Sequence, residues 1–165
     1  METSFKFKHI ENNLIKLLML FIGNQNICKY IYYLNDDPLN NADVSIDLIN
    51  NGNIIVAPYN EKIIMEEKVI VFLNPLLGSL DNYPLSTITY EMDIVTPIDK
   101  WILSGLGQFR TFRIADEFSQ LIDQQKVAGI KDVTITKFKI FKVNDSFSGL
   151  SLLIDVNSSS MKGLR

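Results

Sequence analysis

The stretch from Gln108 to Val156 restricts the possible folds more than any other part of the chain. Gln108 to Gln125 carries apolar residues at helical spacing, whereas Lys131 to Val143 and Phe147 to Val156 have the composition of strands. The turn Asn144-Asp145-Ser146 separates these two strands. An amphipathic helix beside an antiparallel hairpin predicts a helix packed on a sheet, which is a rigid surface suited to self-association.

The apolar alternation changes phase inside the strand expected at 131–143. Val133 and Ile135 fall on one parity, and Phe138 and Ile140 fall on the other. A β-bulge near Lys137 explains this slip, because it inserts one extra residue into a strand. Burial of the strand on both faces explains it equally well, and the sequence leaves both readings open.

The first sixty residues predict helices followed by a long loop. His9 to Leu34 has helical spacing that Gly23-Asn24 interrupts, which indicates either two helices or one kinked helix. Asn35 to Pro38 ends this region, because proline disfavours helix in the residue before it. Leu39 to Asn60 is rich in Asn and Asp and predicts an excursion with at most one short strand, a candidate docking arm.

Two further strands are expected in the middle of the chain. Lys62 to Leu73 keeps its apolar residues mainly on one parity, and Asn74-Pro75 is expected to break that strand. A polar turn around Asp81-Asn82 follows. Thr87 to Val95 alternates most regularly, and is therefore expected to bury one face.

These elements predict an α+β fold in one domain, with an antiparallel sheet of four to five strands. An N-terminal helix, or helix pair, and one long helix are expected to pack on that sheet. We expect residues 1–8 to form an N-terminal arm, residues 9–157 to form the domain with its extended loop 39–60, and residues 158–165 to form a tail.

Composition argues against several classes of protein. The formal charge of −3 shows no footprint for sequence-specific nucleic-acid binding. The single cysteine, Cys28, and the single histidine, His9, provide no zinc-binding cluster, and we expect Cys28 to be buried and inert. The longest apolar run, Leu17 to Ile22, is far shorter than the roughly 20 residues of a membrane-spanning helix. No cofactor, metal or membrane association is expected.

Two acidic motifs could in principle support chemistry. Glu91 and Asp93 lie two apart on a strand and therefore share a face, as a metal site or a hydrolase would require. The alternation around them favours the solvated face of a half-buried sheet or a subunit contact. Asp36 and Asp37 precede Pro38 without the spacing of a calcium loop, which favours a turn or capping role.

Four other residues stand out as candidate interface groups. Arg110 and Arg113 lie at the start of a helix, where cations are slightly unfavourable, and we expect an acidic neighbour from the same or another chain to hold them. Trp101 is typical of a core edge or of an interface anchor. Phe147 opens the last strand. Together with Asp36, Asp37 and Pro38, these residues form the predicted interface set, and no catalytic residue is assigned.

Several segments, taken in order, resemble the small neck proteins of tailed bacteriophages, which are head–tail connector, tail-completion or tail-terminator proteins. The segments are ICKYIYYLNDDPL, KIIMEEKVIVFL, the strand end TPIDKW, FRTFRIADEFSQLI and VNDSFSGLSLLIDV. The resemblance extends from about Asn24 to Val156 and rests on the order of fold-bearing patterns, since no active-site motif is present.

The resemblance implies a structural virion subunit without enzymatic activity, made in the host cytoplasm and located at the head–tail junction. Such subunits form rings, typically hexamers or dodecamers, that contact portal, connector or tail-tube proteins. Two alternatives remain at this point. One is a monomeric adaptor that binds a protein through the loop 39–60, and the other is a metal-dependent hydrolase using Glu91 and Asp93.

Overall fold

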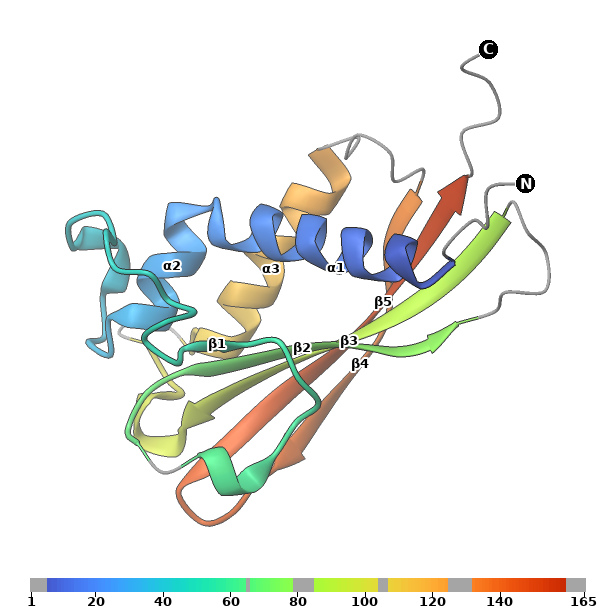
Figure 1. The fold of residues 1–165 in the computed structure, drawn as a ribbon. Coiled ribbons are helices and arrows are strands. Elements are labelled where there is room, and N and C mark those ends of the chain that lie inside the picture. The colour runs from blue at the N-terminus through green and yellow to red at the C-terminus, as the bar shows by residue number, and fades with distance from the viewer. Residues whose placement is uncertain (1–5, 65, 79–84, 104–106, 125–131, 160–165) are drawn as a thin grey trace.

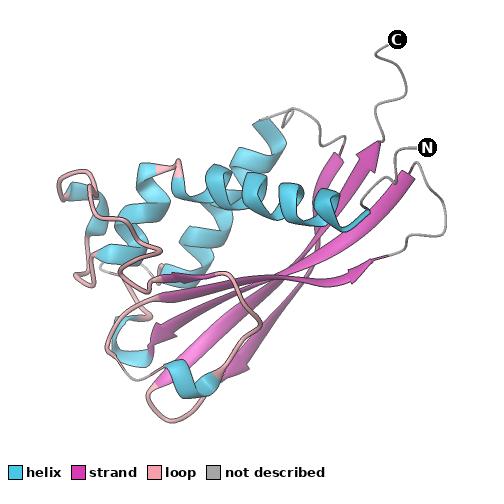
Figure 2. Ribbon diagram, viewed as in Figure 1, coloured by secondary structure: helices cyan, strands magenta, loops and turns pink. Residues whose placement is uncertain are grey.

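The computed structural model describes residues 6–64, 66–78, 85–103, 107–124 and 132–159. Within these ranges, the chain forms three α-helices and a five-stranded sheet (Figures 1 and 2). The helices are α1 (Lys6–Ile22), α2 (Gln25–Tyr32) and α3 (Arg110–Gln124), and the strands are β1 (Ile54–Ile55), β2 (Ile70–Gly78), β3 (Leu85–Pro97), β4 (Asp132–Lys142) and β5 (Phe147–Ser159). Short 3₁₀ helices occupy Pro38–Asn40, Glu61–Ile63 and Ile98–Lys100. The predicted α+β fold is confirmed.

The strands lie in the order β1-β2-β3-β5-β4. All neighbouring pairs are antiparallel except β1 and β2, where Ile54 pairs in parallel with Val71 and Ile55 with Phe72. The sheet is therefore mixed, a feature that the sequence reading did not anticipate. β1 is the short strand expected inside the loop 39–60.

All three helices cover one face of the sheet (Figure 1). α1 packs over β2, and α3 packs over β3, β5 and β4. The alternation predicted for β3 places its apolar residues in the core beneath them. Fully or nearly fully buried residues on this face are Ile88, Tyr90, Met92, Ile94, Leu150, Leu152, Ile154 and Val156.

The helical N-terminal region is divided into two helices rather than one kinked helix. Asn24 supplies the break, because its side-chain oxygen accepts a hydrogen bond of 3.0 Å from the Ile27 amide and caps α2. α1 begins at Lys6, so residues that were expected in an arm are helical. Cys28 is buried as expected, its thiol donates to the Ile22 carbonyl at 3.2 Å, and burial raises its pKa.

The strand expected at Lys62 to Leu73 was placed wrongly. β2 starts at Ile70, because a 3₁₀ helix at Glu61–Ile63 and a loop precede it, and it runs through Pro75 to Gly78. β1 pairs only with Val71 and Phe72, so the rest of β2 lies at an edge of the sheet. Pro75 is tolerated there because an edge residue needs no second strand partner, and the β2–β3 register shifts just after it. The expected turn at Asp81-Asn82 lies outside the described residues.

A smaller cluster forms on the other face of the sheet. Ile64, Ile70, Phe72, Val95 and Phe147 are its buried members. Tyr59, from the segment that leads to β2, packs its ring against both Phe72 and Phe141, with centroids 5.4 Å apart in each case. The last strand of the sheet extends to Ser159, further than expected.

Candidate assembly interface

β4 is an edge strand of 11 residues that pairs only with β5. Among the described residues, no strand lies beside the backbone N–H and C=O groups on its outer side. Edge strands of this length act as templates for pairing with another chain. This makes β4 the first candidate for a functional surface.

The bulge expected near Lys137 is present and decides which side chains β4 presents to the helices. Ile135 pairs with Ile154 and Lys137 with Leu153, so Thr136 is the extra residue. Beyond the bulge, Phe138 pairs with Leu152, a residue of the helix-covered face. The phase slip in the sequence thus keeps the apolar residues of β4 on one face.

This apolar face of β4 is only partly covered. Phe138 is 68% exposed and Ile140 is 51% exposed, although both point to the side of the helices. A groove of about 320 Å³ lies between α3 and β4. Its walls include Phe112 and Ala115 of α3, Ile135 and Phe138 of β4, and Leu150 and Leu152 of β5. Exposed apolar surface beside a free strand edge is typical of a protein–protein contact.

The other face of β4 is basic. Lys137 and Lys139 alternate with Phe138 and Ile140 and are exposed on this face, whereas Lys142 shares the helix-side parity of Phe138 and Ile140. Lys142 lies 2.6 Å from Asp145, whereas Lys137 and Lys139 form no ion pair within the described part of the chain. A strand added to β4 would therefore meet an apolar row on one side and Lys137 and Lys139 on the other, with Glu91 and Asp93 two strands away on the same face.

The acidic pair lies on this face, where Glu91 is half-buried and Asp93 is buried. Asp93 is only 3% exposed, so the solvated face expected for it was wrong. The pKa of Asp93 is raised to about 6, mainly by burial. A hydrogen bond from Ser151 opposes this shift, and the charge of Glu91 adds to it. Ser151 Oγ also donates to Glu91 Oε1 at 3.3 Å. The two residues line a cavity of about 250 Å³ with Tyr59 and Lys139.

Within the described residues, no group of three or more His, Cys, Asp or Glu side chains could hold a metal ion.

Arg110, one of the predicted interface residues, lies inside the chain. Its side chain is completely buried, and it donates hydrogen bonds to the carbonyl oxygens of four residues. These residues are Lys100 at 2.9 Å, Tyr30 at 2.9 Å, Tyr33 at 2.7 Å and Asn35 at 2.7 Å. Burial lowers the pKa of the guanidinium, and the charge of Asp36 opposes that shift. The geometry gives this side chain an internal bracing role.

Arg113 matches the expectation of an acidic neighbour more closely. Its Nη1 lies 4.0 Å from Asp116 Oδ2, one turn further along α3. Both side chains are well exposed, so this pair is a weak one.

The remaining predicted residues are divided between two places. Asp36, Asp37 and Pro38 lie close to Arg110, where Asp37 takes the position before the 3₁₀ helix Pro38–Asn40 and accepts from Asn40 Nδ2. Asp37 therefore takes the turn position expected for it, but its side chain makes no capping hydrogen bond to the 3₁₀ helix.

Trp101 is half-buried, and its carbonyl accepts a hydrogen bond of 2.9 Å from the Arg110 amide. Phe147 lies apart from these residues, in the cluster on the other face of the sheet.

The exposed apolar residues of β4, Phe138 and Ile140, were absent from the predicted interface set. Their signal in the sequence was the alternation KFKI at 137–140, in which Phe138 and Ile140 each follow a lysine. Predicting that these two residues are exposed required both the bulge and the edge position of β4. Only the bulge could be anticipated from the sequence.

The model of the family YomW matches residues 24–156. No curated protein matches the chain. Among the described residues, no helix has both the length and the hydropathy needed to span a bilayer.

Proposed function

The chain belongs to the YomW family, whose name derives from an SPBeta-like prophage, and we propose that it is a structural subunit of a phage particle. In this proposal, copies of the chain form a ring, a hexamer or a dodecamer, at the head–tail junction or the tail end. The ring joins portal or connector proteins to the tail and performs no catalysis.

The observation that supports this proposal is the free edge of β4. A long edge strand that also exposes Phe138 and Ile140 is a liability for a monomer, because it invites pairing and aggregation. A subunit whose task is assembly gains from the same feature, since a partner covers both the edge and the apolar groove.

A ring further requires that two different surfaces meet. Contact between identical surfaces on two copies produces a closed dimer, whereas contact between unlike surfaces produces a ring or a filament. Pairing of β4 with the β4 of a second copy would bring Lys137 and Lys139 close to their counterparts on the basic face. Like charges opposite each other destabilise a strand pair, which favours an unlike surface as the partner of β4.

Native mass spectrometry of the full chain over a range of concentrations tests the proposal. The wild-type chain is expected to form a closed oligomer alone, or on mixing with the portal or tail-tube protein of the same phage. Phe138→Asp is expected to reduce the oligomer at least tenfold, because it places a carboxylate in the apolar contact. Met19→Asp is the matched control, since Met19 is 60% exposed on α1, away from β4.

Circular dichroism would verify that both variants keep the wild-type fold. A chain that stays monomeric under all these conditions would contradict the ring. Binding of one copy to a partner protein without ring formation would instead support the monomeric adaptor.

A further inference from the structure

The loop after α2 contains a second strand-like sequence, in residues 42–47. Asp43, Ser45 and Asp47 alternate with Val44, Ile46 and Leu48, so charged or polar side chains occupy one parity and apolar side chains the other. The chain runs without helix or turn from Ala42 to Ser45, although it pairs with no strand. This acidic and apolar alternation complements the basic and apolar alternation of β4.

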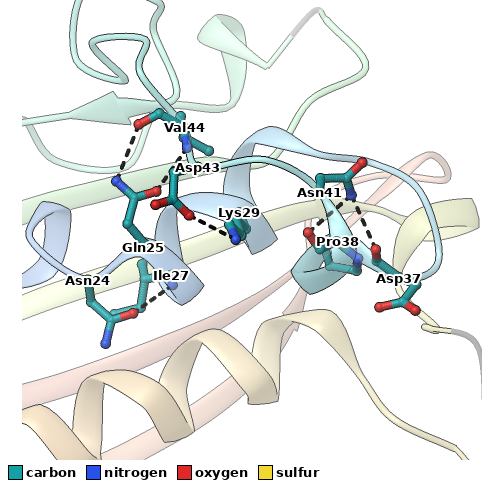
Figure 3. Close-up of polar contacts among 9 residues, drawn as sticks. All are labelled: Asn24, Gln25, Ile27, Lys29, Asp37, Pro38, Asn41, Asp43 and Val44. Atoms are coloured by element: carbon teal, nitrogen blue, oxygen red, sulfur yellow. Dashed lines mark hydrogen bonds and ion pairs between the residues drawn. The ribbon is translucent and has the colours of Figure 1, made fainter.

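One side of this segment is already occupied by its own chain. The Val44 amide donates to Gln25 Oε1 at 2.9 Å, and Gln25 Nε2 donates to the Val44 carbonyl at 3.3 Å (Figure 3). The Gln25 side chain thus binds both backbone groups of one residue, as a neighbouring strand would.

In a strand-like segment, the backbone groups of successive residues point in opposite directions. Those of Asp43 and Ser45 therefore point away from Gln25, and no hydrogen bond within the described chain uses them.

The segment is also held in place before any partner arrives. Asp43 forms an ion pair of 3.0 Å with Lys29 of α2 (Figure 3). Just before it, Asn41 Nδ2 donates to the carbonyls of Asp37 at 3.2 Å and Pro38 at 3.1 Å. A partner strand would thus lose less conformational entropy on pairing than it would with a disordered loop.

We infer that residues 42–47 of one copy add as an extra strand to the outer edge of β4 of the next copy. This inference rests on the proposed function, since it names the contact that builds the ring. The side that carries Asp43 and Ser45 then lies beside Lys137 and Lys139, while Asp47 stays bound to the amides of its own turn. Ile46, which is 44% exposed, lies beside Phe138. Main-chain hydrogen bonds between the added strand and β4 supply affinity. The polar and apolar side chains of the added strand determine which of its faces lies on the lysine side of β4 and which on the apolar side.

The positions of the two segments fit an assembly by unlike surfaces. Residues 42–47 lead into β1, the edge strand at the opposite end of the sheet from β4. Each copy therefore has a donor segment at one end and an acceptor strand at the other. Repetition of this contact joins copies head to tail, as a ring requires.

Intermolecular disulfide formation between variants that each carry one added cysteine tests this contact. Ser45→Cys is mixed with Lys139→Cys or, separately, with Lys137→Cys under mild oxidation, and the native Cys28 is buried and does not compete. Ser45 belongs to the acidic side, so it is expected to link to a residue of the basic face. Ser45→Cys mixed with Phe138→Cys is the matched control, because Phe138 is next to Lys139 but faces the other side.

We expect a linked dimer in at least one of the two lysine mixtures, at tenfold or more the level in the Phe138→Cys mixture. Native mass spectrometry of the wild-type chain is run in parallel. A ring without selective linkage would overturn the strand addition and leave the proposed function standing. No oligomer in any mixture, with or without the phage partner proteins, would overturn both.

Discussion

Arg110 donates a hydrogen bond of 2.9 Å from Nη1 to the carbonyl oxygen of Tyr30, a residue 80 positions earlier in the chain. The same guanidinium reaches Tyr33 and Asn35, so one side chain at the start of α3 satisfies the backbone that follows α2. These carbonyls belong to a helix end, where backbone acceptors lack partners within the helix. Arg110 thus fixes where the N-terminal helices end and the long loop begins.

Replacing Arg110 with lysine is expected to reduce the free energy of unfolding by about 2–4 kcal/mol, because an ammonium cannot reach all four carbonyls and leaves buried acceptors unpaired. Urea denaturation would measure the loss. Arg113→Lys is the control, and it is expected to change stability by less than about 0.5 kcal/mol, since its ion pair is exposed. Equal effects of the two variants would contradict the bracing role.

Asp93 predicts a pH dependence of stability. Burial raises its pKa from 3.8 to about 6, so the folded chain binds this proton more tightly than the unfolded chain does. The protonated carboxyl of Asp93 therefore contributes about 3 kcal/mol to the free energy of unfolding. This contribution is fully present below about pH 4 and is lost as the pH rises through about 6. Asp93→Asn is therefore expected to match the wild-type chain at pH 4 and to exceed it in stability at pH 8.

Urea denaturation of both proteins at several pH values would measure this difference. Parallel profiles for the wild-type chain and Asp93→Asn would show that the buried carboxyl does not titrate in this window. Glu91→Gln is the matched control on the same strand and face. It is expected to change the profile less, because the charge of Glu91 is the smallest contribution to the shift of Asp93.

Gly149 lies directly beneath the ring of Phe141 on the neighbouring strand. A Cβ at this position would lie under 3.0 Å from three atoms of that ring. Gly149→Ala is therefore expected to lower the free energy of unfolding by about 1–3 kcal/mol, because Phe141 must move away from Tyr59. A double-mutant cycle with Phe141→Leu would measure the coupling, and additive losses would contradict the ring as the cause.

Deletion of Thr136 is expected to be tolerated, with a change in stability of about 1 kcal/mol or less. Thr136 is the extra residue of the bulge, so its removal restores regular alternation and leaves Phe138 and Ile140 on the helix side. Deletion of Lys139 is the control, because it moves Ile140 and Phe141 to the wrong faces. Thermal unfolding would compare the two deletions, and similar losses would contradict the assignment of the extra residue.

Where periodicity alone sets structure, the sequence was sufficient. The alternation around Tyr90 placed β3 correctly, and the phase slip between Ile135 and Phe138 located the bulge. β2 was misplaced because the apolar residues before it, such as Ile63, belong to a 3₁₀ helix and a loop, while Pro75 is tolerated at an edge. The parallel pairing of β1 depends on contacts far along the chain, which local patterns do not encode.

The candidate interface was harder to predict than the fold. An arginine at the start of a helix can brace the backbone of its own chain or contact another chain, and the sequence is the same in both cases. Only the burial of Arg110 distinguishes the two roles. Phe138 and Ile140 appeared to be ordinary core residues, because which strand lies at the sheet edge depends on the strand order. The acidic alternation of residues 42–47 became meaningful only when Gln25 was found to occupy one of its two sides.

The long-range bonds of Arg110 also affect how the chain is made on the ribosome. α1, α2 and β1 leave the exit tunnel well before α3, yet the carbonyls that follow α2 gain their donor only when α3 arrives. The sheet has the same dependence, since β3 gains its second neighbour, β5, only after α3 and β4 have been made. A copy truncated ahead of the β4–β5 hairpin keeps Arg110 and the carbonyls that it binds, but it lacks β4 and therefore has no docking edge to offer.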